Sequence, residues 1–524
     1  MSKFYITTSI IYASQPPHIG NTYEAIVTDA VARYHKLIGD DVYFLTGTDE
    51  HGLKIERNAE KEGVTPQEFV DRIAGNLRKE WDLCMVEYND FIRTTEDRHK
   101  NIVKRMFKKL YDQGDIYKKS YEGWYCVPDE AFHTDSQINK TPDGNLCPDC
   151  GRPVEWLKEE VYFFRLSAYA DRLAAHIDQN PDFIQPDNRR NEMVNGYIKP
   201  GLQDFCVSRM SFKWGIPVEF DPGHVMYVWV DALSNYITAL GYDPSEQRDA
   251  APHDRSAETK KTSLFDQYWP CDVHVIGKDI LRFHTLYWPG LLMALGVPLP
   301  KQVFAHPWFL MGSDKMSKSL GNVIYAPELV DKYGVDCTRY YVLREMPFAR
   351  DGNITRELFV SRCNTDLAND LGNLASRSIT MAEKYFDGTV TPECVPQNEV
   401  LELCAASRER YTDAMEKLAI QTAVTEAMAP VIRANRFIDE TMPWELAKDP
   451  DKTEDLRQVL YTLLETLRGA SILLYPVMPL AMGKLRLQLG LTEVPVWDEK
   501  PPAGFTVKRG DNLFPRIVME EAAT

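Results

Sequence analysis

Two short stretches, far apart in the chain, carry side chains suited to binding a polyphosphate. The first contains His18, Gly20 and Asn21, and the second is a small polar loop, Lys315-Met316-Ser317-Lys318-Ser319, flanked by glycines. A helix N-terminus donates hydrogen bonds to phosphate, and lysine provides a mobile point charge. Gly20 lets a ligand approach the backbone closely. Either stretch alone also fits an ordinary turn or surface loop, so both interpretations stay open at this point.

The elements around the first stretch predict a βαβ unit. Residues 4–11 are rich in β-branched and aromatic side chains and predict a buried strand. Apolar residues then recur at helical spacing from Tyr23 to Tyr34, and Gly39 stands where this helix would end. A second strand is predicted at residues 41–46. Such a unit favours parallel strands and places its first turn where a nucleotide phosphate meets helix N–H groups.

Together, the stretches at residues 18–21 and 315–319 resemble the paired signatures of the class I aminoacyl-tRNA synthetases. The second stretch matches fully, whereas the first has Asn21 in place of the final histidine, so that it can still donate a hydrogen bond but cannot become cationic. The resemblance implies an α/β fold with a Rossmann-type parallel-sheet catalytic domain that binds ATP with Mg²⁺. It implies that the catalytic residues are His18, Asn21, Lys315 and Lys318.

Further segments resemble the methionyl-tRNA synthetases within this class. They include Tyr12, Trp229-Val230-Asp231-Ala232 and Gly277-Lys278-Asp279-Ile280. The resemblance implies that Gly277 and Lys278 face ATP and that Asp49 receives the ammonium group of methionine. It also implies a mostly aromatic pocket for the flexible thioether, lined by Ile10, Tyr12, Trp229, Ala232, Tyr236, Ile280, His284 and Trp288. We expect the segment at residues 226–232 to be a strand where the sheet resumes, and residues 273–276 to form another strand.

Residues 117–223 interrupt the βαβ pattern and contain a candidate zinc site. Cys147-Pro148-Asp149-Cys150-Gly151 is typical of a zinc knuckle, in which two thiolates bind one ion around a tight turn. The other half has Cys126 followed by Asp129, where many relatives have a second cysteine. We predict a structural Zn²⁺ bound by Cys126, Asp129, Cys147 and Cys150, with His133 as a substitute for Asp129. A degenerate knuckle that binds no metal is the alternative.

The C-terminal part predicts a helical bundle. Apolar residues from Leu456 to Leu467 indicate a helix with one apolar face, as antiparallel packing requires. Asn373, Arg377 and Trp444 resemble the family's anticodon-recognising positions, and stacking with edge hydrogen bonds suits single-stranded bases. The predicted division is a catalytic domain in two halves at 1–116 and 224–325, a connective insert at 117–223, a connector at 326–356 and an anticodon-binding domain at 357–524.

Composition limits the partners and the compartment. A length of 524 residues exceeds one hydrophobic core, and a net charge of −17 disfavours general nucleic-acid or DNA binding but permits a specific RNA with a local basic patch. No apolar run is long enough to cross a membrane. Ten cysteines without a disulfide pattern favour the reducing cytoplasm. Because the first signature lies close to Met1 and no further module follows the bundle, we expect no targeting peptide and a monomer.

The resemblance implies a methionine–tRNA ligase. Methionine and ATP would give methionyl-adenylate and pyrophosphate, and the aminoacyl group would then pass to the 3′ end of tRNA(Met) with release of AMP. Neither step needs a protein nucleophile, so catalysis depends on positioning and on stabilising phosphate charge. Three alternatives remain: another class I synthetase, a catalytically silent tRNA-binding paralogue, and a nucleotidyltransferase that uses no tRNA.

Overall fold

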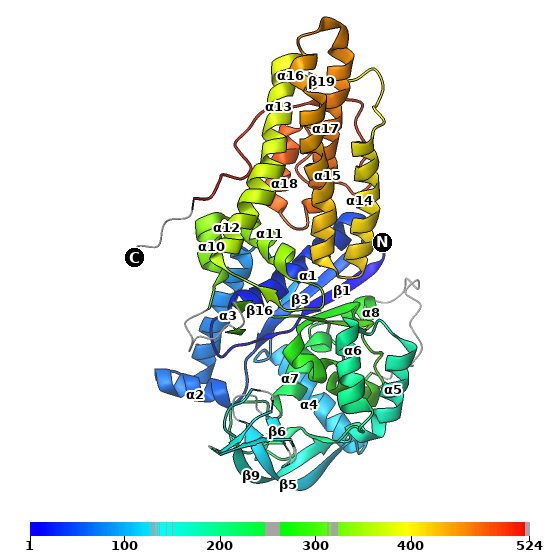
Figure 1. Ribbon diagram of the computed structural model, residues 1–524. Coiled ribbons are helices and arrows are strands. Elements are labelled where there is room, and N and C mark those ends of the chain that lie inside the picture. Colours follow the sequence, from blue (N-terminus) through cyan, green and yellow to red (C-terminus); the bar gives the residue numbers. More distant parts are fainter. Residues whose placement is uncertain are drawn as a thin grey trace, which may run out of the picture.

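An α/β core lies between a long helical bundle and a β-rich lobe (Figure 1). The structure, a computed structural model, describes residues 1–126, 131–133, 135, 137–142, 144–148, 150–246, 263–311, 314–315 and 323–518. Within these ranges no helix is both long and apolar enough to span a bilayer. All ten cysteines fall inside them, and none forms a disulfide.

A parallel sheet forms the centre of the core. In the part of the chain that the structure describes, this sheet has seven strands, of which six follow the order β10 (Ile184–Gln185), β15 (Gln302–His306), β14 (Val273–Gly277), β1 (Lys3–Thr8), β3 (Asp41–Asp49) and β2 (Ile11–Tyr12). The seventh, β4 (Asp90–Arg93), also pairs with β3. Because β1 lies between β3 and β14, the strand order reverses there, and ligands bind at the carboxyl ends beside such a point.

The predicted βαβ unit is confirmed. Strands β1 and β3 pair in parallel with Phe4 opposite Val42, and α1 (Ile19–Ile38) connects them. Gly39 ends α1 with φ of 100°, a left-handed conformation that glycine adopts without a Cβ clash. The strand predicted at residues 273–276 is β14. The remaining helices of this first part are α2 (Leu53–Glu62), α3 (Pro66–Leu83) and α4 (Asp97–Asp112).

The prediction of a strand across residues 226–232 was wrong. Strand β13 covers only Val225–Met226, and the helix α7 (Val228–Thr238) begins almost at once. Nearly every side chain of α7 is buried, and a short buried run of apolar residues does not distinguish a strand from a helix by its periodicity. Trp229, Asp231 and Ala232 therefore lie in the first turns of a helix.

The β-rich lobe is built on a long antiparallel ribbon of β5 (Ile116–Cys126) and β9 (Glu155–Phe164). Short strands extend it: β6 (Ala131–His133), β7 (Asn139–Thr141), β8 (Gly144–Leu146), β11 (Phe205–Cys206) and β12 (Ser208–Arg209). The helices α5 (Ala170–Gln179) and α6 (Asp187–Met193) flank β10. Strand β10 comes from the predicted insert but completes one edge of the main sheet, so the insert and the core are joined.

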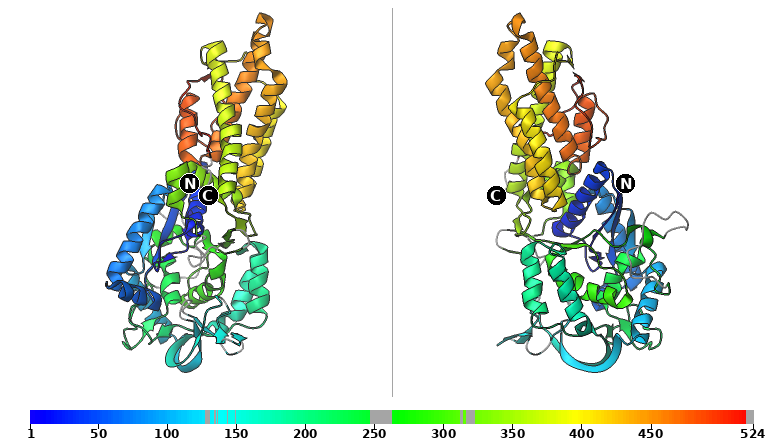
Figure 2. Two further views of the ribbon diagram at one scale, coloured as in Figure 1. Left: turned by 60° about the vertical axis from the view of Figure 1, so that its left-hand side comes forward. Right: turned by 90° about the vertical axis from the view of Figure 1, so that its right-hand side faces the viewer.

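From residue 326 onward the chain is almost entirely helical (Figure 2), whereas the sequence predicted this character only from residue 357. The elements are α10 (Ala326–Tyr333), α11 (Val335–Glu345), α12 (Arg356–Arg362), α13 (Asn373–Phe386), α14 (Glu399–Glu416), α15 (Ile420–Thr441), α16 (Pro443–Leu446), α17 (Thr453–Leu474) and α18 (Pro479–Gln488). Helix α17 holds the predicted apolar face, but it is buried nearly all round because α13, α14, α15 and α18 pack against it.

One buried arginine joins the connector to three other parts of the molecule. Arg339 on α11 is fully buried, and its Nη2 donates to Asp29 Oδ2 on α1 at 2.6 Å. Its Nε donates to the carbonyl of Val477, between α17 and α18, at 2.9 Å, and its Nη1 to the carbonyl of Cys84, after α3, at 3.0 Å. Burial alone would raise the pKa of Asp29, but Arg339 and Arg33 outweigh it and lower that pKa.

Replacing this arginine tests its role. Arg339→Met leaves Asp29 and the carbonyls without their buried donor, so we expect the free energy of unfolding to fall by about 3 kcal/mol, measured by urea and thermal unfolding. The control Arg356→Met removes an exposed guanidinium that lies 3.5 Å from Glu328. It should cost less than about 0.5 kcal/mol. Equal losses in both variants would contradict the role assigned to Arg339.

Candidate functional site

The first signature forms the N-terminus of α1. His18 is the N-cap residue: its Nδ1 accepts the Gly20 N–H at 3.1 Å, and its own N–H donates to Asn21 Oδ1 at 3.2 Å. Since Nδ1 is an acceptor, the proton of the neutral imidazole is on Nε2, which can donate to a ligand. A Cβ on Gly20 would lie 2.9 Å from His18 Cε1, so glycine lets the imidazole fold over the helix end.

The second signature is tethered to the first. The Ile19 N–H donates to the carbonyl of Ile324 at 2.9 Å, just beyond the lysine loop. On the other side of the loop, Lys315 belongs to β17 (Asp314–Lys315), which pairs with β16 (Phe309–Met311), and β16 pairs in turn with β18 (Gly352–Asn353). Lys318 lies outside the described residues, so its predicted role is untested.

A buried ion pair behind His18 was not predicted from the sequence. Glu24 Oε1 accepts the Ser9 N–H at 2.7 Å and the Ser9 hydroxyl at 2.6 Å, and Glu24 Oε2 lies 3.0 Å from His306 Nε2. Burial alone would lower the pKa of His306, but Glu24 outweighs it and raises that pKa. The pair fixes α1 against the ends of β1 and β15. Its only signal in the sequence is a carboxylate on the apolar face of the predicted helix.

Four of the predicted methionine-pocket residues form a cluster, the aromatic cage: Trp229, Tyr236, His284 and Trp288. The Tyr236 hydroxyl lies 2.7 Å from His284 Nε2, while His284 Nδ1 lies 3.0 Å from the carbonyl of Ile280. A carbonyl accepts only, so Nδ1 carries the proton and Nε2 accepts from tyrosine. Burial lowers the pKa of His284 to about 4, which keeps the cage uncharged at neutral pH.

The other predicted pocket residues surround the cage. Trp229 stacks flat on Phe283 with ring centroids 3.8 Å apart, and Ile10 and Ile280 pack, half-buried, on the same apolar cluster. Ala232 is buried one turn from Trp229. Tyr12 lies opposite Asp49 in the pairing of β2 with β3, and it packs on a separate cluster with Lys54 Nζ 5.5 Å above its ring. Ile10, Trp229 and Ile280 therefore share one apolar cluster, whereas Tyr12, the last residue of β2, packs on another.

A second unpredicted network lies next to Asp49. The Asp231 carboxylate is buried between two imidazoles, with Oδ2 at 2.6 Å from His51 Nδ1 and Oδ1 at 2.7 Å from His99 Nε2. His99 Nδ1 lies 2.7 Å from the Thr238 hydroxyl. Burial would raise the pKa of Asp231, but the imidazoles outweigh it and lower that pKa. The network fixes α4 and α7 to the loop that follows Asp49 and carries His51.

Gly277 and Lys278, which were predicted to face ATP, lie at the carboxyl end of β14. Gly277 stands opposite His306 in the pairing with β15, and a Cβ there would lie 2.6 Å from Asp279 Oδ1. Lys278 Nζ is 2.6 Å from Asp351 Oδ1 and 4.2 Å from the centre of the Trp308 ring. In this structure Lys278 therefore joins the segment that follows β14 to the segment that precedes β18.

The knuckle brings together three sulfur atoms and one imidazole. Cys126 Sγ and Cys150 Sγ are 3.5 Å apart, and all three sulfurs, with that of Cys147, lie within 4.8 Å of one another. The Nε2 atom of the buried His133 lies 3.3 Å from Cys147 Sγ. Asp129 lies outside the described residues. Three clustered cysteine sulfurs suit Zn²⁺, so the cysteines of the predicted metal site fit the metal, and the His133 imidazole lies next to one of them.

The predicted anticodon residues lie on the bundle. Asn373 and Arg377 are one turn apart on α13 and share a face. Arg377 Nη2 lies 3.3 Å from Asp439 Oδ1 near the end of α15, and Trp444, 39% exposed, follows that helix on α16. Arg377 therefore lies beside the end of α15 that leads into α16, and α16 lies far from the parallel sheet (Figure 1).

The sequence of the chain matches a known family over most of its length. The family "tRNA synthetases class I (M)" matches residues 4–379. The chain belongs to the methionyl-tRNA synthetase family. The methionine–tRNA ligase of Clostridium tetani is 51% identical over 525 residues, which cover 99% of this chain and 79% of that protein. The methionine–tRNA ligase of Clostridium perfringens is 52% identical over 526 residues, which cover 99% of this chain and 78% of that protein.

Solved structures of this family share the fold. Mycobacterium tuberculosis methionyl-tRNA synthetase in complex with methionyl-adenylate has a TM-score of 0.91 and 40% identity, and the match covers 98% of this chain and 100% of that one. The free form of the same synthetase has a TM-score of 0.82 and 37% identity, covering 99% of both chains. The predicted fold class and family are confirmed.

The Glu24–His306 pair predicts a pH dependence of stability. Because the pKa of His306 is raised in the folded chain, the ion pair contributes its full stabilisation of the folded state at pH values below about 6.5, the pKa of this histidine in the unfolded chain. This contribution is lost as the pH rises through the raised value. Glu24→Gln keeps the shape but removes the charge, so its melting temperature should change less than that of the wild type as the pH rises above about 6.5. The control Glu60→Gln, on the exposed side of α2, should follow the wild type. Parallel curves for Glu24→Gln and the wild type would contradict the pairing.

Proposed function

We propose that this chain activates methionine with ATP and transfers it to tRNA(Met), using the residues at the carboxyl ends of the parallel sheet. The observation that carries the proposal is the aromatic cage with a neutral His284, placed beside the N-terminus of α1. An uncharged aromatic pocket suits a polarisable thioether, and a helix N-terminus suits a phosphate. The membership of the family, whose relatives are methionine–tRNA ligases, supports the same assignment.

In the first step, the methionine carboxylate attacks the α-phosphorus of ATP in line, and pyrophosphate leaves. His18 Nε2–H donates to the phosphates, while Lys315 and Lys318 neutralise charge on them. Mg²⁺ that enters with ATP supplies further neutralisation. The Asn21 carbonyl oxygen holds the His18 backbone, so the amide NH₂ is the group left for the nucleotide. Gly277 leaves room for the nucleotide at the end of β14.

Methionine is oriented by its two ends. Asp49 accepts hydrogen bonds from the ammonium group, and the aromatic cage surrounds the thioether. The Tyr236–His284 bond leaves no charged group in the cage, so a charged side chain would lose its hydration there without a partner. A hydrophobic pocket distinguishes one methylene by only about 1–3 kcal/mol, so close analogues of methionine should be activated as well.

The transfer step requires recognition of the correct tRNA. Trp444 provides an exposed indole for stacking, and Asn373 with Arg377 provides edge hydrogen bonds, at the far end of the bundle. The absence of disulfides among the ten cysteines fits the cytoplasm as the site of this reaction. We propose that the chain acts as a monomer.

We further propose that the knuckle binds one structural Zn²⁺ through Cys126, Cys147, Cys150 and a fourth ligand. His133, whose Nε2 lies 3.3 Å from Cys147 Sγ, is one candidate for that ligand, and Asp129, which lies outside the described residues, is the other. The metal stabilises a lobe whose own apolar cluster contains little more than Ile138 and Val154 around the two buried cysteines.

The proposed substrate can be tested by the amino acid that supports exchange. ATP–pyrophosphate exchange, measured side by side with methionine, leucine, isoleucine, valine and cysteine, should be strongest with methionine. Loss of a hydrogen-bonded charge in Asp49→Asn should raise the KM for methionine about 10- to 100-fold with a smaller change in kcat. The control Asp112→Asn, on the exposed side of α4, should leave both unchanged. Exchange with none of the amino acids would refute the proposed function.

The proposed zinc site can be tested by the metal content of the purified chain. The purified chain should contain about one Zn²⁺, measured by elemental mass spectrometry, and the Co²⁺-substituted form should show the visible absorption of a tetrahedral thiolate site. His133→Ala should lower the metal content and shift that spectrum. His176→Ala changes a histidine on α5, outside the knuckle, and serves as the control. If Asp129→Ala lost the metal while His133→Ala kept it, Asp129 would be the fourth ligand instead.

A further inference from the structure

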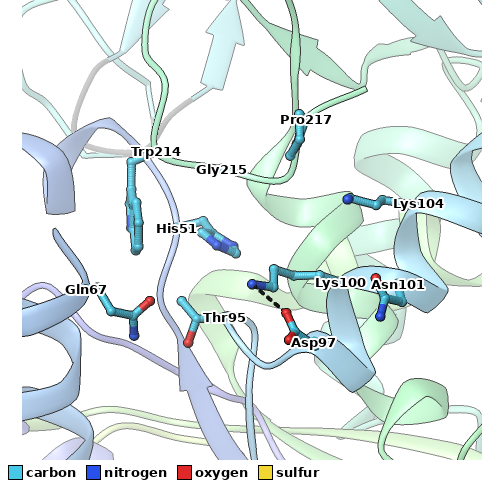
Figure 3. A pocket seen from close by; sticks show the side chains of 10 residues that line it. All are labelled: His51, Gln67, Thr95, Asp97, Lys100, Asn101, Lys104, Trp214, Gly215 and Pro217. Carbon is cyan, nitrogen blue, oxygen red and sulfur yellow. Dashed lines mark ion pairs between the residues drawn. The ribbon is translucent and has the colours of Figure 1, made fainter. Parts of the chain in front are cut away.

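A cavity of about 260 Å³ lies beside His51 and is lined by side chains that the mechanism above does not use (Figure 3). His51 and Trp214 form one side of it, and Lys100, Asn101 and Lys104 extend into it from α4 on the other. The cavity therefore combines an aromatic surface with two lysines, and one carboxylate, Asp97, also lines it. That combination suits a nucleotide with its phosphate.

The cavity is linked directly to the proposed methionine pocket. His51 follows Asp49 by two positions, and its Nδ1 is bonded to Asp231 at 2.6 Å. Asp231 lies on α7 between Trp229 and Ala232, which belong to the predicted pocket. A ligand in the cavity would therefore contact the opposite side of the same histidine–carboxylate pair that supports the site of chemistry.

The two lysines are arranged so that a phosphate can displace their present partners. Lys100 and Lys104 are one turn apart on α4 and share a face. Lys100 lies 3.0 Å from an Asp97 carboxylate that is 87% exposed, while the lysine itself is 33% exposed. Lys104 lies 3.5 Å from a Glu219 carboxylate that is 64% exposed, while the lysine is 25% exposed. Pairs with such exposed carboxylates are weak, so a phosphate inside the cavity can compete for both ammonium groups.

The aromatic side of the cavity is rigid. The Trp214 indole N–H donates to the carbonyl of Glu50 at 2.6 Å, and the Trp214 carbonyl accepts the Gly52 N–H at 3.0 Å. The ring is thus fixed to the loop after β3 and presents a surface on which a base can stack. The Asn101 side chain makes no hydrogen bond to any residue that the structure describes and is available to a base edge or a phosphate.

We propose that this cavity binds one nucleotide of the single-stranded 3′ end of the substrate tRNA. Its phosphate lies between Lys100 and Lys104, and its base stacks against Trp214. The inference rests on the proposed function, in which the tRNA 3′ end must reach methionyl-adenylate beside Asp49. Because the chain carries a net charge of −17, a local pair of cations is needed to attract a phosphodiester to this edge. Released pyrophosphate has the same chemistry, and the experiment separates the two.

The test uses the full-length protein and separates the two half-reactions. In the double variant Lys100→Gln with Lys104→Gln, ATP–pyrophosphate exchange should stay within about twofold of the wild type, because methionine and ATP bind elsewhere. The kcat/KM for tRNA(Met) in aminoacylation should fall at least about tenfold, and its dependence on salt should become shallower. The matched control is Lys108→Gln, one turn further along α4, whose lysine pairs with Asp112 instead. This control should match the wild type in both assays.

Substitutions of Trp214 test the stacking. Trp214→Phe keeps an aromatic ring and should retain most of the transfer activity, whereas Trp214→Leu should lose it without loss of exchange. Unchanged aminoacylation in the lysine double variant would overturn the proposal. An equal loss of exchange and aminoacylation would also overturn it and assign the cavity to pyrophosphate. Absence of exchange in the wild type would instead refute the proposed function itself, so the two failures are distinguishable.

Discussion

The arrangement of the whole chain depends on how α1 is held. The Asp29 carboxylate in the middle of this helix is buried and accepts from Arg33 and from Arg339, whose other donors reach carbonyl groups after α3 and between α17 and α18. A guanidinium presents its donors in a fixed plane, so these bonds define directions as well as distances. A buried ion pair often adds little net stability, but one misplaced partner is costly, which favours a single docking of bundle on core.

The same helix has its two ends in different functional regions. At its N-terminus His18 caps the helix and Asn21 accepts the His18 backbone N–H, while Glu24 of the same helix pairs with His306. Near its C-terminus the Tyr34 hydroxyl donates to Glu416 of the bundle at 3.0 Å. The end of α1 that carries the first signature and the bundle are thus connected through one continuous element. This geometry explains how a bundle that projects far from the sheet keeps a defined orientation toward the site of chemistry (Figure 1).

The site separates neutral from charged surroundings. In the aromatic cage, burial keeps His284 uncharged and the tyrosine hydroxyl satisfies it. Near the cage, the buried Asp231 carboxylate is paired with the imidazoles of His51 and His99. In the proposed function, a methionine side chain would therefore meet no charge, while its ammonium group would meet Asp49 and the phosphates would meet His18 and the lysines. Unpaired charges so close to a dry pocket would shift their pKa values and weaken this separation.

The sequence by itself determined the features that depend on neighbouring residues: the βαβ unit, the limits of α1, both signatures and the helical character of the bundle. His18, Asn21 and Gly39 act through contacts within a few positions, so their roles are visible as local patterns. Only the tertiary structure decided that residues 228–238 form a helix, that β10 joins the main sheet, and that His133 approaches Cys147. It also decided the pairs Glu24–His306 and His51–Asp231, whose members come from distant segments. Burial sets the chemistry of these groups, and burial results from the packing of segments whose meeting no local pattern encodes.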